Sequence, residues 1–458
     1  MYKTALILAA GEGKRLKSFI PKVMHKVCGQ PLIEYVLDAV QVVSDDAPIA
    51  IVGNGKELIE EHLGDRVRYA LQLERKGTAH AVLMAKELLE GKKGYVTVTA
   101  GDVPAITATT FEILLDYTIK NELSACVLTA IVPDATGYGR IVRDEFGQLC
   151  SIVEHRDATD EQRKIKEINT SIYCFDIESL FSALGKVKND NEQGELYLTD
   201  TIAIMKAEGK AVGGVATFDA EEAEGINDRL QLCTTEKIMR RRINRKLMEN
   251  GVTMIDPEST YIEKSVVIGK DTIVYPNNFI SGKTVIGQSC VIYPNSRIDN
   301  AIIGDEVSIQ SSVILSAQVG DKTTVGPFAY LRPNTKIGKK ARIGDFVELK
   351  NANIGNASKV SHLAYVGDAD IGESCNIGCG VVFVNYDGKN KFRTCVEDGA
   401  FIGSNSNLVA PLCIGKNAFI AAGSTVTQDV PEDALCIARE RQVNKPEWVK
   451  QKREKNND

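Results

Sequence analysis

The spacing of apolar side chains changes near residue 250 and divides the chain into two parts. In the first part, Ala5–Ala9, Pro48–Val52 and Tyr95–Thr99 read as strands buried on both faces. Apolar residues after Pro31 recur at helical spacing, and a further helix is expected over 78–90 with Thr78 as its cap. Alternating strands and helices predict an α/β, Rossmann-like domain with a mostly parallel sheet.

Residues 229–250 predict one basic helix between the two parts. Apolar Ile238, Ile243 and Leu247 interleave with basic side chains, and Gly251 can end the helix. The arginines within Arg240–Arg245 permit a nucleic-acid interpretation. A solvated helix face is the commoner meaning of such a run, and we expect it here.

From residue 251 onward, aliphatic side chains recur every sixth position. Neither an α-helix nor an alternating strand has this period. It is typical of a parallel β-helix, in which each hexapeptide forms one short strand and one corner with its aliphatic side chain inside. The repeat consists of Ile262, Ile268, Val274, Ile280, Ile286, Ile292, Ile298, Ile303, Ile309, Leu315, Val319, Val325, Leu331, Ile337, Ile343, Leu349, Ile354, Val360, Val366, Ile371, Ile377, Phe383, Val396, Ile402, Leu408, Ile414, Ile420 and Val426.

The repeat is interrupted once, between Phe383 and Val396. Asn385–Asn390 has no place in the period and is expected to leave the solenoid as a loop, where function tends to lie. Residues after about Val443 are charged and expected to fray. The predicted organisation is therefore an α/β domain over 1–228, a helical linker over 229–250 and a hexapeptide-repeat domain over 251–458.

Composition narrows the functional classes. The 458 residues carry a net charge of −6, which gives no reason to expect a general nucleic-acid or membrane surface. No apolar run approaches the roughly 18 residues of a membrane span. The run Ala5–Ala10 leads at once into a charged glycine loop, as a buried strand would, rather than a signal peptide.

Eleven cysteines without a pairing pattern indicate reduced thiols and a cytoplasmic location. Cys375 and Cys379 are the only close pair. We do not expect them to bind a metal, because no further ligands have suitable spacing.

The first predicted strand runs into the glycine-rich segment Leu8–Leu16. Leu16 replaces the third glycine of a dinucleotide-binding loop, and no Ser or Thr follows Gly13-Lys14 as a P-loop requires. Small residues still let backbone N–H groups approach an anion. Asp102 follows the Tyr95–Thr99 strand, at the carboxyl edge where open α/β sheets bind ligands, and a carboxylate there suits Mg²⁺.

The whole chain resembles the family of bifunctional N-acetylglucosamine-1-phosphate uridylyltransferases/glucosamine-1-phosphate N-acetyltransferases. The resemblance covers both parts, which makes it more specific than any single motif. It rests on Leu8–Leu16, Pro21–Val23, Gly29–Leu32, Gln72, Gly77–Ala79, Gly101–Pro104, Tyr138–Arg140, Val153-Glu154, Glu167–Thr170, Gly225–Asp228 and Lys359–Asp368.

For the first part, the resemblance implies that Asp102 and Asn227 hold Mg²⁺. Lys22 is expected to clamp phosphate, with Arg15 beside it as a second catalytic cation. The uridine part of the nucleotide is assigned to Leu8, Ala9, Ala10, Gly11, Gln72, Gly77 and Thr78. The N-acetylglucosamine end is assigned to Gly139, Glu154 and Asn169.

For the second part, the resemblance makes His362 the general base of acetyl transfer. His362 lies off the aliphatic period and should face outward, and an ordinary imidazole pKa of about 6.5 suits removal of an amine proton near neutral pH. Arg332 and Lys350 are expected to bind the phosphate of glucosamine-1-phosphate. The remaining sugar contacts are Tyr365 and Asn376, and the acetyl-coenzyme A contacts are Cys379, Asn385, Tyr386, Ser404, Ala422 and Arg439.

One residue departs from the family pattern. Cys379 stands where the family usually has alanine. Cysteine is only slightly larger, so we expect coenzyme binding to survive and the site to become sensitive to thiol reagents.

The resemblance implies a bifunctional enzyme of UDP-N-acetylglucosamine biosynthesis that uses acetyl-coenzyme A, UTP and Mg²⁺. It further implies a left-handed β-helix and a homotrimer without nucleic-acid partners or membrane insertion. One alternative is a single-activity nucleotidyltransferase with a structural β-helix, against which His362, Lys350 and the Asn385-Tyr386 loop argue. Another is a non-catalytic regulatory subunit, against which Lys22 and the Asp102–Asn227 pair argue.

Overall fold

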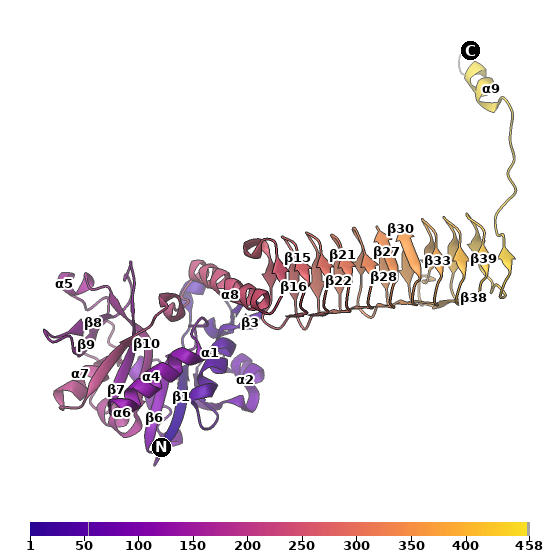
Figure 1. Cartoon of the computed structure of the whole chain (residues 1–458). Coiled ribbons are helices and arrows are strands. Elements are labelled where there is room, and N and C mark those ends of the chain that lie inside the picture. Colours follow the sequence, from indigo (N-terminus) through magenta and orange to yellow (C-terminus); the bar gives the residue numbers. More distant parts are fainter. Residues whose placement is uncertain (54, 456–458) are drawn as a thin grey trace. The chain divides into compact units, whose positions relative to one another are not determined.

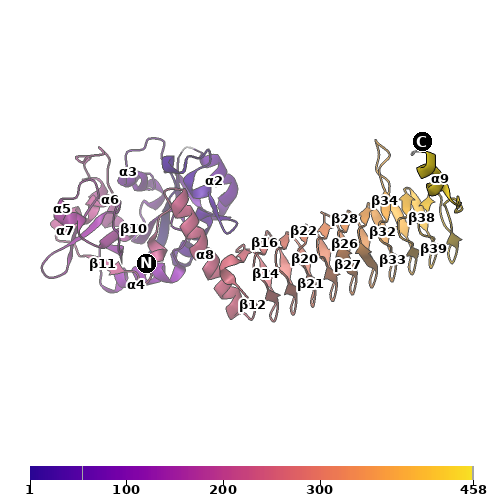
Figure 2. The same ribbon diagram turned by 90° about the horizontal axis from the view of Figure 1, so that it is seen from above.

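The computed structural model describes residues 1–53 and 55–455. It divides into two compact units, Met1–Arg242 and Ile243–Asp458, which are described separately (Figures 1 and 2). The last three residues of the predicted second domain, 456–458, lie outside the described part. Among the described residues, no helix has the length and apolar character needed to cross a membrane.

Unit 1 is built on a mixed sheet of nine strands within the described residues, and four of the six pairs along its main path are parallel. The main path runs β11-β7-β10-β6-β1-β4-β5, with β8 and β9 attached through β10. β10 is antiparallel to β6 and β7. The strands are β1 (Tyr2–Leu8), β4 (Ile49–Val52), β5 (Arg68–Leu71), β6 (Gly94–Ala100), β7 (Ala125–Ile131), β8 (Arg140–Arg143), β9 (Leu149–Val153), β10 (Glu167–Asp176) and β11 (Val212–Ala216), with β2 (Lys26–Val27) and β3 (Gln30–Pro31) forming a small separate ribbon.

Helices cover both faces of this sheet. Along β1, Leu6 belongs to one apolar cluster and its neighbours Ala5 and Ile7 to another. Strands buried on both faces read as continuous apolar runs, which is how the sequence revealed them. The helices are α1 (Leu32–Val40), α2 (Lys56–Leu63), α3 (Thr78–Leu83), α4 (Ala108–Lys120), α5 (Asp160–Arg163), α6 (Ile177–Leu184), α7 (Asp200–Ala207) and α8 (Arg229–Glu249).

The helix expected over 78–90 is shorter and is capped differently. α3 ends at Leu83, and a separate 3-10 turn covers Glu87–Leu89. Gly77 takes the N-cap position with φ 106°, so Thr78 already lies in the first turn. The Thr78 hydroxyl accepts a hydrogen bond from the Leu198 N–H at 3.0 Å instead of capping α3. The prediction of Thr78 as a cap is therefore wrong.

The basic helix is present, but its arginines are not simply solvated. Arg240 is 7% exposed. Arg241 donates to the Glu221 carboxylate, and Arg242 donates to Asp219 Oδ2 at 2.9 Å. The carboxylates of the neighbouring 3-10 segment therefore neutralise part of this face, which weakens the nucleic-acid interpretation. The expected solvated face is confirmed at Arg241 and Arg245, which are exposed, and is wrong at Arg240, which is buried. The helix ends as predicted before Gly251, whose φ is 95°.

Unit 2 is a left-handed parallel β-helix whose described strands form three parallel sheets. The first sheet contains β12 (Thr253–Met254), β15 (Ile273–Val274), β18 (Val291–Ile292), β21 (Ser308–Ile309), β24 (Thr324–Val325), β27 (Arg342–Asp345), β30 (Lys359–His362), β33 (Asn376–Ile377), β36 (Phe401–Ile402), β39 (Phe419–Ile420) and β41 (Leu435–Cys436). The second contains β13 (Tyr261–Ile262), β16 (Phe279–Ser281), β19 (Arg297–Asp299), β22 (Val313–Leu315), β25 (Tyr330–Leu331), β28 (Glu348–Lys350), β31 (Tyr365–Gly367), β34 (Val382–Val384), β37 (Asn407–Val409) and β40 (Thr425–Val426). The third contains β14 (Val267–Ile268), β17 (Val285–Ile286), β20 (Ile302–Ile303), β23 (Gln318–Val319), β26 (Lys336–Ile337), β29 (Asn353–Ile354), β32 (Ala369–Ile371), β35 (Thr394–Val396) and β38 (Leu412–Ile414), and α9 (Trp448–Lys455) follows the solenoid.

The predicted aliphatic period is the core of this solenoid, with one correction. Every predicted inward residue is buried except Leu315, which is half-buried, and Ile314 takes the inward position. The chain makes two consecutive five-residue steps there, from Ile309 to Ile314 and on to Val319, where the sequence predicted a step of six residues followed by one of four. The segment that interrupts the repeat leaves the solenoid as a loop beside β34, as predicted (Figure 2). An isolated bridge between Tyr386 and Lys391 closes this loop.

Candidate active sites

Several predicted site residues of unit 1 lie at one edge of its sheet. Strands β5, β4, β1 and β6 are mutually parallel, so their carboxyl ends meet there. Ala9 continues from β1 and donates its N–H to Ile51 O at 2.8 Å. Gln72 follows β5, and Gly101-Asp102 follows β6. The glycine-rich loop, Gln72 and Asp102 therefore share the carboxyl edge, where such sheets bind ligands.

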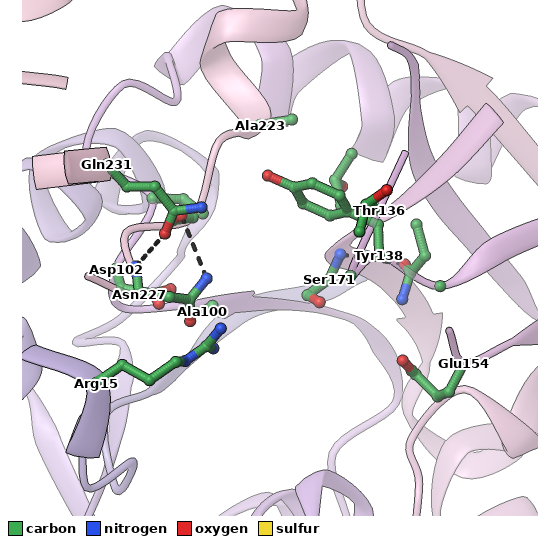
Figure 3. Close-up of a pocket in the computed structure, with 16 residues that line it drawn as sticks. Arg15, Ala100, Asp102, Thr136, Tyr138, Glu154, Ser171, Ala223, Asn227 and Gln231 are labelled. Atoms are coloured by element: carbon green, nitrogen blue, oxygen red, sulfur yellow. Dashed lines mark hydrogen bonds between the residues drawn. The ribbon is translucent and has the colours of Figure 1, made fainter. Parts of the chain in front are cut away.

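A cavity of about 280 Å³ opens in this unit (Figure 3). Six predicted residues line it: Arg15, Asp102, Gly139, Glu154, Asn169 and Asn227. The predicted nucleotide residues Leu8, Ala9, Ala10, Gly11, Gln72, Gly77 and Thr78 do not belong to its lining. Lining residues that the sequence reading missed include Tyr138, Ser171 and Gln231.

Lys22 joins the two expected metal ligands. Its Nζ donates to Asn227 Oδ1 at 2.9 Å and forms an ion pair with Asp102 Oδ2. The side chains of Lys22 and Asp102 are 15% and 13% exposed, so little solvent screens the pair. Ile226 N–H donates to Asp102 O at 3.0 Å and fixes the turn that carries Asn227 beside Asp102.

The donor set of this turn fits Mg²⁺. A carboxylate and an amide oxygen are hard ligands, and Mg²⁺ keeps waters and substrate phosphates as its other ligands. Among the described residues no group of three or more His, Cys, Asp or Glu side chains is placed to hold a metal ion. The Lys22 ammonium contacts both Asp102 and Asn227, which marks a position where positive charge is stabilised.

The far end of the cavity is polar. Burial raises the pKa of Glu154, and the nearby Asp157 charge adds to the shift. Asn169 donates to Tyr173 Oη at 2.8 Å and accepts the Ser171 N–H at 3.1 Å, so its amide orientation is fixed. These groups are suited to the hydroxyl and amide groups of a sugar.

Gln72 is oriented by the residues beside it. Its Nε2 donates to Gly77 O at 3.2 Å and to His80 Nδ1 at 3.1 Å. The carbonyl oxygen Oε1 is then the group left to accept a hydrogen bond from a base. Gly77 has φ 106°, and a Cβ there would collide with the Leu196 backbone, so this turn requires glycine.

In unit 2, adjacent coils align the predicted phosphate and sugar residues. Lys350 pairs with Gly367 between β28 and β31. Arg332, directly after β25, donates to Glu348 Oε1 at 2.9 Å. A Cβ on Gly367 would collide with both the Tyr365 hydroxyl and the Asn385 amide, so these two groups meet over that glycine.

Two residues that the sequence reading missed complete this cluster. Asp368 forms an ion pair with Lys350 at 3.5 Å and accepts hydrogen bonds from Asn351 and Asn385. Burial alone would raise its pKa, but these hydrogen bonds and the Lys350 charge lower it. Lys391 lies near Lys350, and the proximity of the Lys350 ammonium lowers the pKa of Lys391. The sequence signal that could have identified Lys391 was its position inside the loop that interrupts the repeat.

His362 and three predicted coenzyme residues share one edge of the solenoid. Each stands two positions after an inward aliphatic residue, so they take equivalent places on successive coils. His362 is exposed and contacts Asp345 on the preceding coil. Asn405 N–H donates to Cys379 O at 2.7 Å, and Gly423 N–H donates to Ser404 O at 2.8 Å. This edge consists of Asp345, His362, Cys379, Ser404 and Ala422. Arg439 lies beside its last coil, because a Cβ on Gly423 would be 3.7 Å from Arg439 Cδ.

The predicted acetyl-transfer residues lie on two different sheets of the solenoid. Asn376 lies on β33 of the first sheet, whereas Lys350 and Tyr365 lie on the second. Within the described part of the chain, no hydrogen bond or ion pair joins His362 or Asn376 to the Arg332–Lys350–Tyr365 group. Asn385, a predicted coenzyme residue, by contrast reaches that group through Asp368.

Comparison with known proteins covers the entire chain. A family model described as nucleotidyl transferase matches residues 4–220. The bifunctional protein GlmU of Clostridium beijerinckii is 55% identical over 453 residues, which cover 99% of each chain. The bifunctional protein GlmU of Clostridium perfringens (strain ATCC 13124) is 55% identical over 454 residues, covering 99% of this chain and 100% of the relative. The bifunctional protein GlmU of Clostridium acetobutylicum is 51% identical over 453 residues, covering 99% of both.

Proposed function

The chain belongs to the family of bifunctional GlmU proteins, and from this premise we propose how its two units divide the chemistry. It is a bifunctional enzyme of UDP-N-acetylglucosamine biosynthesis. One reaction acetylates glucosamine-1-phosphate with acetyl-coenzyme A, and the other transfers uridylyl from UTP to N-acetylglucosamine-1-phosphate with release of pyrophosphate. Uridylyl transfer is assigned to residues 1–228 and acetyl transfer to residues 251–458, with 229–250 as the connecting helix.

In uridylyl transfer, a phosphate oxygen of the sugar phosphate attacks the α-phosphorus of UTP. The bond from that phosphorus to the oxygen bridging to the β-phosphate breaks, and pyrophosphate leaves. The obstacle is crowded negative charge, so fixed cations and backbone donors supply most of the catalysis. Lys22 and Arg15 provide the cations. Leu8–Gly11, Gln72, Gly77 and Thr78 hold the uridine part, while Gly139, Glu154 and Asn169 hold the sugar.

Asp102 and Asn227 are the proposed Mg²⁺ ligands. When bound, Mg²⁺ would neutralise phosphate charge at the reacting phosphorus. Lys22 keeps the two ligand side chains together in its absence, because its ammonium contacts both of them. That contact is the observation that carries the assignment of unit 1.

In acetyl transfer, the amine nitrogen of glucosamine-1-phosphate attacks the thioester carbon. His362 Nε2 accepts the proton that the amine loses, the carbon–sulfur bond breaks, and the proton passes to the departing sulfur of coenzyme A. Arg332, Lys350 and Lys391 bind the phosphate, and Tyr365 and Asn376 contact the sugar. Acetyl-coenzyme A lies along the solenoid edge, with Cys379, Ser404 and Ala422 beneath it and Asn385, Tyr386 and Arg439 flanking it.

The enzyme is proposed to act as a homotrimer in the cytoplasm. The position of His362 and Asn376 on the first sheet, and of Lys350 and Tyr365 on the second, supports acetyl-transfer sites shared between neighbouring copies. Many stacked aromatic pairs lie on the solenoid surface, among them Phe328 and Phe346 at 5.4 Å between ring centroids, each 58% exposed, and such apolar surface favours association. Reduced cysteines and the two cosubstrates support the cytoplasmic location.

The assignment is tested by separating the reactions. Purified protein receives acetyl-coenzyme A and glucosamine-1-phosphate while free thiol is followed. A parallel sample receives Mg²⁺, UTP and N-acetylglucosamine-1-phosphate while pyrophosphate is followed. We expect Asp102→Ala to abolish only pyrophosphate release and His362→Ala to abolish only thiol release. Pyrophosphate without thiol in the unmodified enzyme would leave the β-helix a structural domain, and absence of both products would favour a regulatory subunit.

A further inference from the structure

Arg229 contacts two of the loops that carry the catalytic residues of unit 1. Its Nε donates to the Leu16 carbonyl at 3.1 Å, and its Nη1 lies 3.5 Å from His25 Nδ1. The residue itself begins α8, two positions after Asn227. One guanidinium group therefore joins the start of α8 to two neighbouring loops that lie 213 and 204 positions earlier in the sequence.

Each contact lies next to a residue proposed to act on phosphate or metal. Leu16 directly follows Arg15. His25 ends the 3-10 turn that begins at Lys22, and its N–H donates to Lys22 O at 3.3 Å. The glycine-rich loop also packs directly on that turn, because a Cβ on Gly13 would lie only 2.8 Å from Lys22 Cβ.

The His25 ring is held in one form by its surroundings. A guanidinium group only donates hydrogen bonds, so Nδ1 must accept and the ring is neutral with its proton on Nε2. His25 is 5% exposed, and Nε2 has no partner among the described residues. Burial first, and then the Arg229 charge, lower the pKa of His25, which keeps the ring an acceptor at neutral pH.

We propose that Arg229, acting through His25 and Leu16, is a positioning residue for uridylyl transfer. It fixes the spacing of Arg15, Lys22 and Asn227 without touching the substrate. The inference rests on the function proposed for unit 1. Small displacements of positioned groups cost large factors in rate, and partners that orient metal ligands typically contribute 10- to 100-fold to metal affinity or activity.

The start of α8 is stabilised by residues other than Arg229, so the proposed positioning role of Arg229 can be separated from a role in holding the helix. Asp228 caps α8 on its own, because its Oδ1 accepts the N–H groups of Leu230 and Gln231, each at 2.9 Å. Gln231 Oε1 accepts the Asn227 N–H at 2.7 Å. Replacement of Arg229 therefore leaves the helix start intact and removes only the links to the other two loops.

The test uses the full chain with Arg229→Met, Arg229→Lys and His25→Gln. Arg245→Met is the matched control, since Arg245 lies on the same helix, is exposed and, within the described part of the chain, pairs only with Glu249 at 2.9 Å. Pyrophosphate release is measured across a Mg²⁺ series, together with thiol release and the thermal midpoint. For Arg229→Met we expect kcat/KM for UTP to fall 10- to 100-fold and the half-saturating Mg²⁺ concentration to rise. Arg229→Lys should recover part of both, and thiol release and Arg245→Met should match the unmodified enzyme.

An unchanged Mg²⁺ half-saturation and KM for UTP in Arg229→Met would overturn the inference, even if kcat fell with the thermal midpoint. If Arg229→Met does not fold, Arg229→Lys decides, because one ammonium group cannot reach both acceptors as the guanidinium does: a raised half-saturating Mg²⁺ concentration is expected, and an unchanged one overturns the inference. His25→Gln, whose amide oxygen can still accept from Arg229, should match the unmodified enzyme, and loss of pyrophosphate release in this variant would overturn the role of His25 as acceptor. Failure of the unmodified enzyme to release pyrophosphate would reject the function of unit 1 itself.

Discussion

His362 Nδ1 lies 2.7 Å from Asp345 Oδ1, although the two residues are 17 positions apart in the sequence. They are register partners on adjacent coils, β27 and β30. A carboxylate only accepts hydrogen bonds, so Nδ1 carries the proton and Nε2 keeps the lone pair that a general base needs. The same hydrogen bond lowers the pKa of Asp345.

Replacing Asp345 with asparagine should slow acetyl transfer about 10- to 100-fold, part of the 10²–10⁴ that general bases typically contribute. An amide can donate to Nδ1 and so favours the wrong tautomer of His362. Thiol release measures the effect, and pyrophosphate release should not change. Asp321→Asn is the control, because Asp321 pairs with Lys339 at 2.8 Å elsewhere on the solenoid. Equal rates for the two variants would remove Asp345 from the mechanism.

Lys22→Met should reduce pyrophosphate release more than 100-fold, the scale expected when a preorganised charge is removed from a phosphoryl site. Divalent-ion binding should instead become tighter, because the ammonium no longer competes for Asp102 and Asn227. Mn²⁺ titration followed by electron paramagnetic resonance checks this in the absence of substrate. Weaker Mn²⁺ binding would mean that Asp102 and Asn227 are not the ligands.

Glu154→Gln should weaken binding of N-acetylglucosamine-1-phosphate and stabilise the fold at high pH. Burial raises the pKa of Glu154, so the folded state binds its proton more tightly than the unfolded state. The stability contributed by this group is complete below the unfolded value of about 4.3 and is lost as pH rises through the raised folded value. The thermal midpoint of the variant should therefore exceed that of the unmodified enzyme at pH 8 and approach it at pH 4. A constant difference across this range would contradict the linkage.

Lys391→Ala should raise the KM for glucosamine-1-phosphate about tenfold, because one charge-assisted contact to the phosphate is lost. The effect should shrink as salt screens the phosphate. Lys389→Ala, in the same loop, is the control, because Lys389 uses its backbone N–H rather than its side chain to contact Asp387. A matching KM in both variants would exclude a phosphate role for Lys391.

Alkylation of Cys379 should block acetyl transfer while pyrophosphate release continues. Cys379 is exposed on the edge that carries His362 and Ser404, and an added group would occupy the proposed coenzyme path. Cys379→Ala should be active and resistant to the reagent. Cys233 is also exposed, but in unit 1, so Cys233→Ser should remain sensitive. Full activity of enzyme shown by mass spectrometry to be alkylated at Cys379 would reject the prediction.

The sequence by itself determined the elements whose signals are local. A period of six cannot be satisfied by a helix or a flat sheet, so the solenoid and its inward residues followed directly from the spacing. The strand–loop pattern likewise placed Asp102 at the carboxyl edge of the sheet. Errors arose where the local signal was ambiguous. Two five-residue steps close together moved the inward position from Leu315 to Ile314, and Gly77 displaced Thr78 from the cap.

Only the tertiary structure decided which distant residues meet. Stacking of coils brings Asp345 to His362 and Asp368 to both Lys350 and Asn385, because the number of residues per coil sets the register. Folding of the α/β unit brings Arg229 to His25 across 204 positions. No local sequence pattern predicts such contacts, because each one depends on how two distant segments pack in the folded chain. The sequence therefore predicted which residues have suitable chemistry, and tertiary packing determined how their side chains are oriented.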